Sequence, residues 1–383
     1  MASLDPTARP IAAVAARLAL PVFAGTLFAS ALLLFAVQPM FTKLVLPRLG
    51  GAPAVWSVAM VVFQAALLLG YAYAHLISRM LTPARGAIVH LGVLAVAELT
   101  LPIGVAAGFE TPPETGVTLW LVGLIAASIG LPFVALSASA PLLQHWFAAT
   151  SHPQARNPYV LYAASNLGSF AALLAYPFVI EPLLTLREQS QLWSFGFGIL
   201  AAFVALAACL AARGSATKII AVAAPPTFAQ RMSWVVLAAV PAGLVVAVTA
   251  YITTDVAAAP FLWVLPLALY LLTFVAVFRE RPWVSHAFIL RAVPFVVAPL
   301  SISILGADKA YWVAVIALNL VAFFVLGVAC HGELYRRRPA AARLTEFYLW
   351  TSLGGVIGGI FAGLVAPNIF NGTYEYPILR PCY

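Results

Sequence analysis

The sequence predicts an all-α bundle that crosses a lipid bilayer many times. Hydrophobic residues make up 63% of the 383 residues and charged residues only 8%, against about 25% charged in a soluble domain. Apolar stretches long enough to cross a bilayer, about 20 residues each, follow one another along the chain. Between Arg48 and Arg79, for example, there is no Lys, Arg, Asp or Glu. A water-soluble fold would have to bury all of these stretches at once.

Eleven segments are candidate transmembrane helices. They cover residues 18–46, 53–77, 86–106, 118–146, 158–182, 190–212, 232–251, 258–278, 285–306, 310–334 and 344–366. The first continues through ALLLFAVQPMF without a small-residue cleavage site, so we interpret it as an uncleaved span rather than a signal peptide. The fourth carries Pro132 and Pro141, which either kink a helix or break it, as at some transport sites.

The spans divide into two sets around a polar break. Residues 1–212 are expected to form a six-helix half, 213–231 a cytoplasmic linker, 232–366 a five-helix half and 367–383 an outside tail. The segment YVLYAASNLGSFAALLAYPF of the fifth span resembles FYLWTSLGGVIGGIFAGLVAP of the eleventh, six spans later. This echo predicts a repeat of six helices, as in many transporters, from which the last helix is missing.

The basic residues indicate topology rather than nucleic-acid binding. With a cytoplasmic N-terminus, fourteen Lys and Arg residues lie in inside segments and five in outside segments. This bias is what the positive-inside rule expects. We therefore expect a protein that is surrounded by the lipid bilayer, with its N-terminus in the cytoplasm and its C-terminus outside, and no nucleic-acid partner.

Several long motifs resemble one family. They are QPMFTKLVLPRLGGAPAVWSVAMVVFQAALLLGYAYAHL (38–76), YVLYAASNLGSFAALLAYPFVIEP (159–182), TTDVAAAPFLWVLPLALYLLTF (253–274) and CHGELYRRRP with LTEFYLWTSLGGVIGG (330–359). Together they are similar to the membrane half of bacterial fused major-facilitator/spermidine-synthase-like proteins, over residues 20–377. The resemblance implies a transporter-like bundle in a bacterial inner membrane, here 6+5 instead of 6+6. In the family a soluble aminopropyltransferase-like domain often follows, and this sequence lacks both that domain and the last span.

The glycine-rich run GGVIGG at 354–359 does not indicate an enzyme. It lies within an apolar span and does not follow a strand, so pairs such as Gly354 and Gly358 indicate close helix packing instead of a phosphate-binding loop. Without a catalytic domain we expect no enzyme activity and no cofactor. Cys209, Cys330 and Cys382 are too few and too scattered for a metal site.

Polar side chains within the spans are the candidate solute-binding or proton-relay residues, because lipid exposure of such groups is costly. Glu98, near the middle of span 86–106, is either a proton or cation site or a carboxyl bonded to a neighbouring helix. Gln64, Tyr71 and His75 share one helical face. That face either lines a cavity or forms a hydrogen-bonded seam between helices.

Three further polar residues complete this set. Gln38 is a polar point on the first span, and Asn166 lies on the fifth beside Gly168, where backbones can approach closely. Asn166 either pairs with another helix or contacts a solute. Asp255 precedes the eighth span. It is either an acid that stabilises the start of that helix or part of an outer gate.

Residues 330–350 concentrate charge between two apolar runs. Glu333 precedes Arg336 and Arg337 by three and four residues, the spacing of helix-surface ion pairs. Glu346 follows Thr345, an acceptable helix cap, where an acid suits the helix N-terminus. These patterns favour a membrane edge. The alternative is an inner gate or proton relay made by His331, Glu333 and Glu346.

Two functions remain open at this stage. The first is a secondary-transporter-like protein for a small solute, with a cationic, polyamine-like one suggested by the family resemblance. The second is a non-transporting membrane module that anchors or partners a separate aminopropyltransferase-like enzyme. Lipid, a second copy of the chain or another subunit, such as an enzyme subunit, is expected to cover the groove left by the missing helix.

Overall fold

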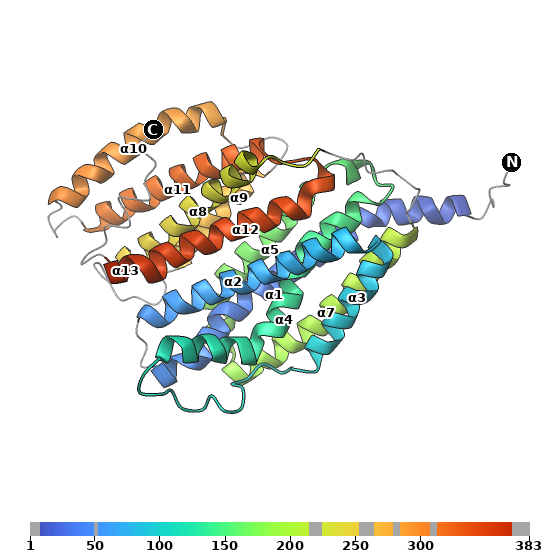
Figure 1. The fold of residues 1–383 in the computed structure, drawn as a ribbon, viewed down its shortest axis with the longest axis horizontal. Helices are drawn as coiled ribbons and strands as arrows, with labels where there is room; N and C mark the ends of the chain where they lie inside the picture. The colour runs from blue at the N-terminus through green and yellow to red at the C-terminus, as the bar shows by residue number, and fades with distance from the viewer. Residues whose placement is uncertain are drawn as a thin grey trace.

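The protein is a bundle of long helices (Figure 1). The computed structural model describes residues 8–49, 53–213, 224–252, 264–278, 284–306 and 312–369. Its long helices are α1 (Ala8–Leu49), α2 (Pro53–Met80), α3 (Pro83–Glu98), α4 (Val117–Ala148), α5 (Val160–Ala175), α7 (Leu186–Arg213), α8 (Phe228–Tyr251), α9 (Val264–Val277), α10 (His286–Gly306), α11 (Trp312–Arg336) and α12 (Leu344–Ile360). The described residues include no β-strand.

The short elements mostly extend or join these helices. They are the 3₁₀ turns Pro153–Arg156 and Ala341–Arg343, the π-helical turns Tyr176–Ile180 and Phe361–Val365, α6 (Glu181–Leu183) and α13 (Ala366–Ile369). Counted with these extensions, eight helical stretches of the described chain are long and apolar enough to cross a membrane, and α9 and α10 are shorter apolar helices. The chain is therefore a multi-pass membrane protein, as the sequence predicts.

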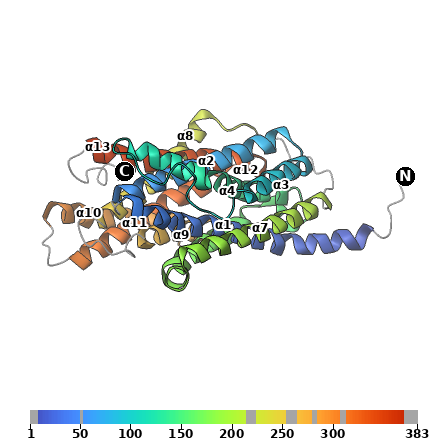
Figure 2. The same ribbon diagram turned by 90° about the horizontal axis from the view of Figure 1, so that it is seen from below.

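Helix α1 is longer than a membrane requires. Its 42 residues span about 63 Å at 1.5 Å per residue, roughly twice the ~30 Å hydrocarbon core. Its first turns extend beyond the ends of the neighbouring helices (Figures 1 and 2). Helix α4 runs without interruption through Pro132 and Pro141, so the described structure has no broken helix there.

The predicted span 86–106 is wrong at its C-terminal end. Helix α3 stops at Glu98 and residues 101–116 form a loop. The Thr100 hydroxyl donates to the carbonyl oxygen of Ala97 at 2.7 Å and so closes the last turn. Pro102 then has no N–H with which to continue the helical pattern. Glu98 consequently lies at a helix end and not in the middle of a span.

The two halves repeat the same helix pairing. Helix α5 packs along α1, and α12 packs along α8. Gly168 on α5 lies against the backbone of Phe28, and Gly358 on α12 lies against the backbone of Ala239, so closely that a side chain at either position would collide. Both α5 and α12 then continue into a π-helical turn. This parallel is what an internal repeat produces, and it confirms that GGVIGG serves helix packing.

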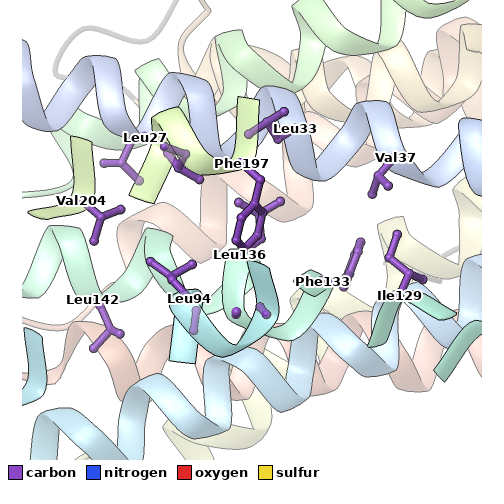
Figure 3. Close-up of a cluster of buried hydrophobic side chains, with 14 of the residues drawn as sticks. Leu27, Leu33, Val37, Leu94, Ile129, Phe133, Leu136, Leu142, Phe197 and Val204 are labelled. Atoms are coloured by element: carbon purple, nitrogen blue, oxygen red, sulfur yellow. The ribbon is translucent and has the colours of Figure 1, made fainter. Parts of the chain in front are cut away.

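The core of the N-terminal half joins four helices (Figure 3). Leu27, Leu33 and Val37 of α1 meet buried side chains of α3, α4 and α7. The Trp193 indole N–H of α7 donates to the carbonyl oxygen of Leu33 at 2.8 Å. This bond satisfies a buried polar group that lipid or an apolar core would leave unpaired at a cost of several kcal/mol.

In the C-terminal half, α11 packs against α8, α9 and α10. Helix α10 lies at the outer edge of the bundle beside α11 (Figures 1 and 2). Phe288 and Phe295 of α10 are largely exposed. Such exposed apolar side chains are expected where a helix faces lipid.

Candidate functional site

A cavity of about 240 Å³ lies among helices of both halves. Helices α1, α2, α4 and α5 contribute to its wall from the N-terminal half, and α8, α9, α11 and α12 from the C-terminal half. The two halves contact each other chiefly through two pairs of helices, α2 with α12 and α5 with α9. The cavity is thus built from segments that are distant in the sequence.

Aromatic rings form one side of the cavity and connect the halves. Tyr162 of α5 lies nearly parallel to Tyr348 of α12, with ring centroids 5.8 Å apart, and Tyr71 of α2 lies 5.9 Å from Tyr348. Phe278, directly after α9, is 4.7 Å from Tyr162. The Tyr348 hydroxyl donates to Oε1 of the buried Gln144 on α4 at 2.8 Å. This last bond crosses between the halves.

Small polar residues of α5 and α12 line the cavity in a paired way. Ser165 and Asn166 on α5, and Thr351 and Ser352 on α12, all belong to its wall. They lie in the two sequence segments that resemble each other. Asn166 Nδ2 donates to the carbonyl oxygen of Tyr162 at 2.9 Å, which leaves its amide oxygen without a described partner. The buried Ser352 hydroxyl has no hydrogen-bond partner among the described residues.

Two glutamines add amide groups. Gln38 donates from Nε2 to the carbonyl oxygen of Leu34 at 3.1 Å, and both it and Gln64 line the cavity. Oε1 of Gln64 is buried and has no hydrogen-bond partner in the described chain. Gly359 on α12 makes room for this amide, because a Cβ there would lie 3.0 Å from Cδ of Gln64. Buried polar groups normally have a partner, so a solute or water is expected at Gln64.

The predicted polar face of α2 is in part a cavity lining and in part a hydrogen-bonded seam between helices. Gln64 and Tyr71 line the cavity, whereas His75 forms part of a seam between helices. Its Nδ1 lies 3.0 Å from Oγ1 of Thr345 on α12, and the Ser78 hydroxyl lies 3.1 Å from the same atom. Thr345 is therefore bonded to α2 and is not the helix cap that the sequence suggested.

Further polar contacts between the halves lie at the same end of the bundle. The Tyr159 hydroxyl donates to the carbonyl oxygen of Pro339 at 3.0 Å. The guanidinium of Arg338 lies over the rings of Tyr335 and Tyr159, at 3.6 and 5.6 Å. This end, where α2 ends and α12 begins, is thus closed by bonds from one half to the other.

Ion pairs surround this closed end. Glu346 is 6% exposed and accepts from Arg231 at 2.7 and 3.0 Å and from Arg343 at 3.4 Å. The residue before α12 is Arg343, which makes no side-chain cap, so Glu346 acts through ion pairs within the C-terminal half.

Glu333 forms the surface ion pairs that its spacing predicts. It lies 2.7 Å from Arg337 and 3.6 Å from Arg336, and His286 of α10 is 3.3 Å away. This geometry confirms the helix-surface ion pairs that the spacing predicts. None of these four residues belongs to the described cavity wall.

His331 lies behind the aromatic wall. It is fully buried, its Nδ1 is 2.7 Å from the Thr273 hydroxyl, and its ring is stacked 3.7 Å from that of Phe274, which lines the cavity. Nε2 has no partner among the described residues. His331 therefore connects α11 to α9, and the structure does not bring it together with Glu333 or Glu346 in one cluster.

Glu98 is not part of the cavity. It is exposed at the end of α3 and lies beside Gly198 of α7. The prediction that it faces the bundle interior is wrong, because its helix ends before the expected span is complete. Asp255 lies outside the described residues. Within the described ranges, no group of three or more His, Cys, Asp or Glu side chains could hold a metal ion.

Several residues of the cavity wall were missed at the level of sequence. Tyr162, Tyr270, Phe274, Tyr348 and Gln144 all line the cavity or bond to its wall. Tyr162 and Tyr348 lie in the two mutually similar segments, and that likeness was the one signal that could have identified them.

No known protein-family profile matches the sequence, and no curated protein matches it. Solved structures do match the fold. A bacterial homologue of the iron transporter ferroportin, in an outward-facing state, has a TM-score of 0.57 at 13% identity and covers 93% of this chain and 94% of its own.

Two further structures are also similar. The E. coli fucose:proton symporter FucP has a TM-score of 0.50 at 16% identity, covering 94% of this chain and 95% of its own. A D-xylose–proton symporter has a TM-score of 0.51 at 12% identity, covering 96% and 94%. These similarities establish the fold: the chain is a multi-pass membrane protein with the helical architecture of major-facilitator-type transporters.

Proposed function

We propose that this protein is a secondary carrier that binds a small solute in the cavity between its halves. The observation that supports this proposal is the cavity itself, because its wall is shared by both halves and carries an unpaired, buried amide oxygen at Gln64. In transporters with repeated halves, a site between the repeats becomes accessible from each side in turn as one half moves against the other. The structural neighbours are transporters, two of them for sugars.

The closed end of the bundle is proposed to face the cytoplasm of a bacterial inner membrane. Arg79, Arg156, Arg231, Arg336 and Arg343 all lie at this end, where the positive-inside rule expects them. Labelling of cysteines introduced at residues 336–338 tests the orientation. Reaction with a membrane-impermeant reagent in intact cells would contradict it.

A disulfide across the closed end tests the carrier proposal. The hydroxyl oxygens of Ser78 and Thr345 are 3.1 Å apart, so Ser78→Cys with Thr345→Cys should form a disulfide under oxidation, in a background lacking Cys209, Cys330 and Cys382. Because the bond holds the two halves together at one end, oxidation should stop solute exchange in proteoliposomes and reduction should restore it. The Ser78→Cys single variant is the matched control.

Exchange is measured with a panel of labelled sugars, phenols and polyamines. Exchange that continues unchanged in fully crosslinked protein would contradict a carrier mechanism. A panel in which no compound exchanges faster than in protein-free liposomes would contradict the transport function itself.

The family resemblance motivates two narrower hypotheses. A polyamine-like solute is the first, and uptake of labelled spermidine would support it. The second is a membrane module that partners a separate aminopropyltransferase-like enzyme or a second copy of the chain. Co-purification of such an enzyme from the native membrane, with no solute exchange by the isolated protein, would favour this module over the carrier.

A further inference from the structure

The described cavity wall carries no formal charge. Among its described residues there is no Asp, Glu, Lys, Arg or His. A charged solute enclosed there would lose its water without gaining an opposite charge, and an unpaired buried ion costs several kcal/mol even after relaxation. A divalent metal ion would also lack its usual charged or imidazole ligands, because the described lining has no carboxylate, imidazole or thiolate group.

The aromatic rings do not compensate for this missing charge. A cation is attracted to the open face of a ring. Tyr162 lies nearly parallel to Tyr348 and has Phe278 at 4.7 Å, and Phe274 is stacked on His331. Part of the face of each of these rings is occupied by a neighbouring ring. A cation–π contact contributes about 0.5–2 kcal/mol, which is less than the several kcal/mol that an unpaired buried ion costs.

The cavity instead offers neutral hydrogen-bonding groups. Oε1 of Gln64 and the hydroxyl of Ser352 are buried without a partner among the described residues. The cavity-lining residues Tyr71, Tyr162 and Tyr270 likewise have no hydroxyl hydrogen bond within the described chain. Orientation of a ligand by a few polar groups within an aromatic pocket is typical of small-molecule sites.

We infer that the cavity binds an uncharged solute with a single ring and hydroxyl or amide groups at its edge. Transport of this solute by the protein depends on the proposed function, whereas binding of the solute in the cavity does not. The volume of about 240 Å³ lies just below the roughly 300–1,000 Å³ of typical ligand pockets, which limits the solute to about one ring. The amide oxygen of Gln64 accepts a hydrogen bond from the solute, and the aromatic side chains of the wall contact its ring.

Three probes of similar size test the charge of the ligand. They are 4-hydroxyphenylethanol, which is neutral, tyramine, which is a cation, and 4-hydroxyphenylacetate, which is an anion. Equilibrium dialysis of the labelled compounds against purified full-length protein gives each affinity. The neutral compound should bind at least about 100-fold more tightly than either ion, because several kcal/mol of desolvation separate them. Spermidine serves as the polycation.

Variants at Gln64 link the result to the cavity. Gln64→Glu keeps the side-chain shape and supplies a carboxylate, so it should shift the preference toward tyramine by at least about tenfold. Asn166→Asp provides a second test if Gln64→Glu does not fold. Gln191→Glu makes the same chemical change on the exposed surface of α7 and should leave all three affinities unchanged.

The outcomes separate the inference from the carrier proposal. Binding of the neutral compound without its uptake by proteoliposomes supports the inference and contradicts the carrier. Tighter binding of tyramine, 4-hydroxyphenylacetate or spermidine by the unmodified protein overturns the inference, whether or not uptake occurs. So does the absence of binding by all three phenols, or an equal response of Gln64→Glu and Gln191→Glu.

Discussion

Adding one methyl group at Gly358 should weaken the contact between α12 and α8. A Cβ at this position would lie 2.9 Å from the backbone nitrogen of Gly243 and 3.0 Å from the carbonyl carbon of Ala239, and closer still to the Ala239 oxygen. Ordinary van der Waals contact begins at 3.4 Å. These neighbours are backbone atoms of a helix, which cannot rotate away, so the two helices must separate by at least about 0.5 Å (3.4 less 2.9).

Gly355 is the matched control, because it lies on the same helix with nothing within 4 Å of its Cβ position. Glycine-to-alanine exchange in a helix gains about 1 kcal/mol of intrinsic propensity at either position, so this gain cancels in the comparison. Overpacking costs about 1–3 kcal/mol. Gly358→Ala should therefore be about 1–3 kcal/mol less stable than Gly355→Ala.

The comparison is made by unfolding the purified protein in detergent micelles without ligand, following helix content against denaturant. Stability that is equal in the two variants, or lower for Gly355→Ala, would refute the close-packing argument. Gly168→Ala on α5 should repeat the Gly358 result, because its Cβ position meets the backbone of Phe28 in the same way.

Three further outcomes are expected. Glu346→Gln should lower the unfolding free energy by about 1–2 kcal/mol, because it deprives the partly exposed Arg231 of a buried carboxylate. Denaturation in micelles measures this loss, and a loss below about 0.3 kcal/mol would contradict the expectation. Trp193→Phe should cost about 1–2 kcal/mol through its lost bond to Leu33, again measured by unfolding, and an unchanged stability would argue against that bond. Glu98→Ala should leave solute exchange within about twofold, as expected for an exposed residue outside the cavity; abolished exchange would return Glu98 to the candidate site.

The membrane-crossing helices were predictable because lipid permits few alternatives. An apolar run of about 20 residues cannot leave its backbone polar groups unpaired in hydrocarbon, and a helix pairs them within the segment. The stretch LTLPIGVA at 99–106 has the same apolar composition but is not helical. Hydropathy measures side chains, whereas Pro102 acts through the backbone by removing an N–H. The expected span 86–106 failed for this reason.

The candidate site was predictable only where polarity was unusual for its surroundings. Gln38, Gln64 and Asn166 are conspicuous because amides are rare in apolar spans, and all three line the cavity. Tyr162 and Tyr348 resemble any other aromatic residues of a membrane core. Their position in the cavity depends on the contact between α5 and α12 across the two halves. A local sequence pattern does not predict such a contact.

The glycine contacts of α5 and α12 have a mechanical consequence. Within each half, backbone touches backbone at Gly168 and Gly358, so neither helix pair can slide without breaking close contacts along its length. Between the halves, each of the polar and aromatic contacts described above involves at least one side chain, as at Tyr162, His75 and Tyr159. Side chains can exchange partners by rotating, in nanoseconds when they are exposed. The molecule is therefore expected to be stiff within each half and compliant between them, so that thermal motion is channelled into rotation of one rigid body against the other.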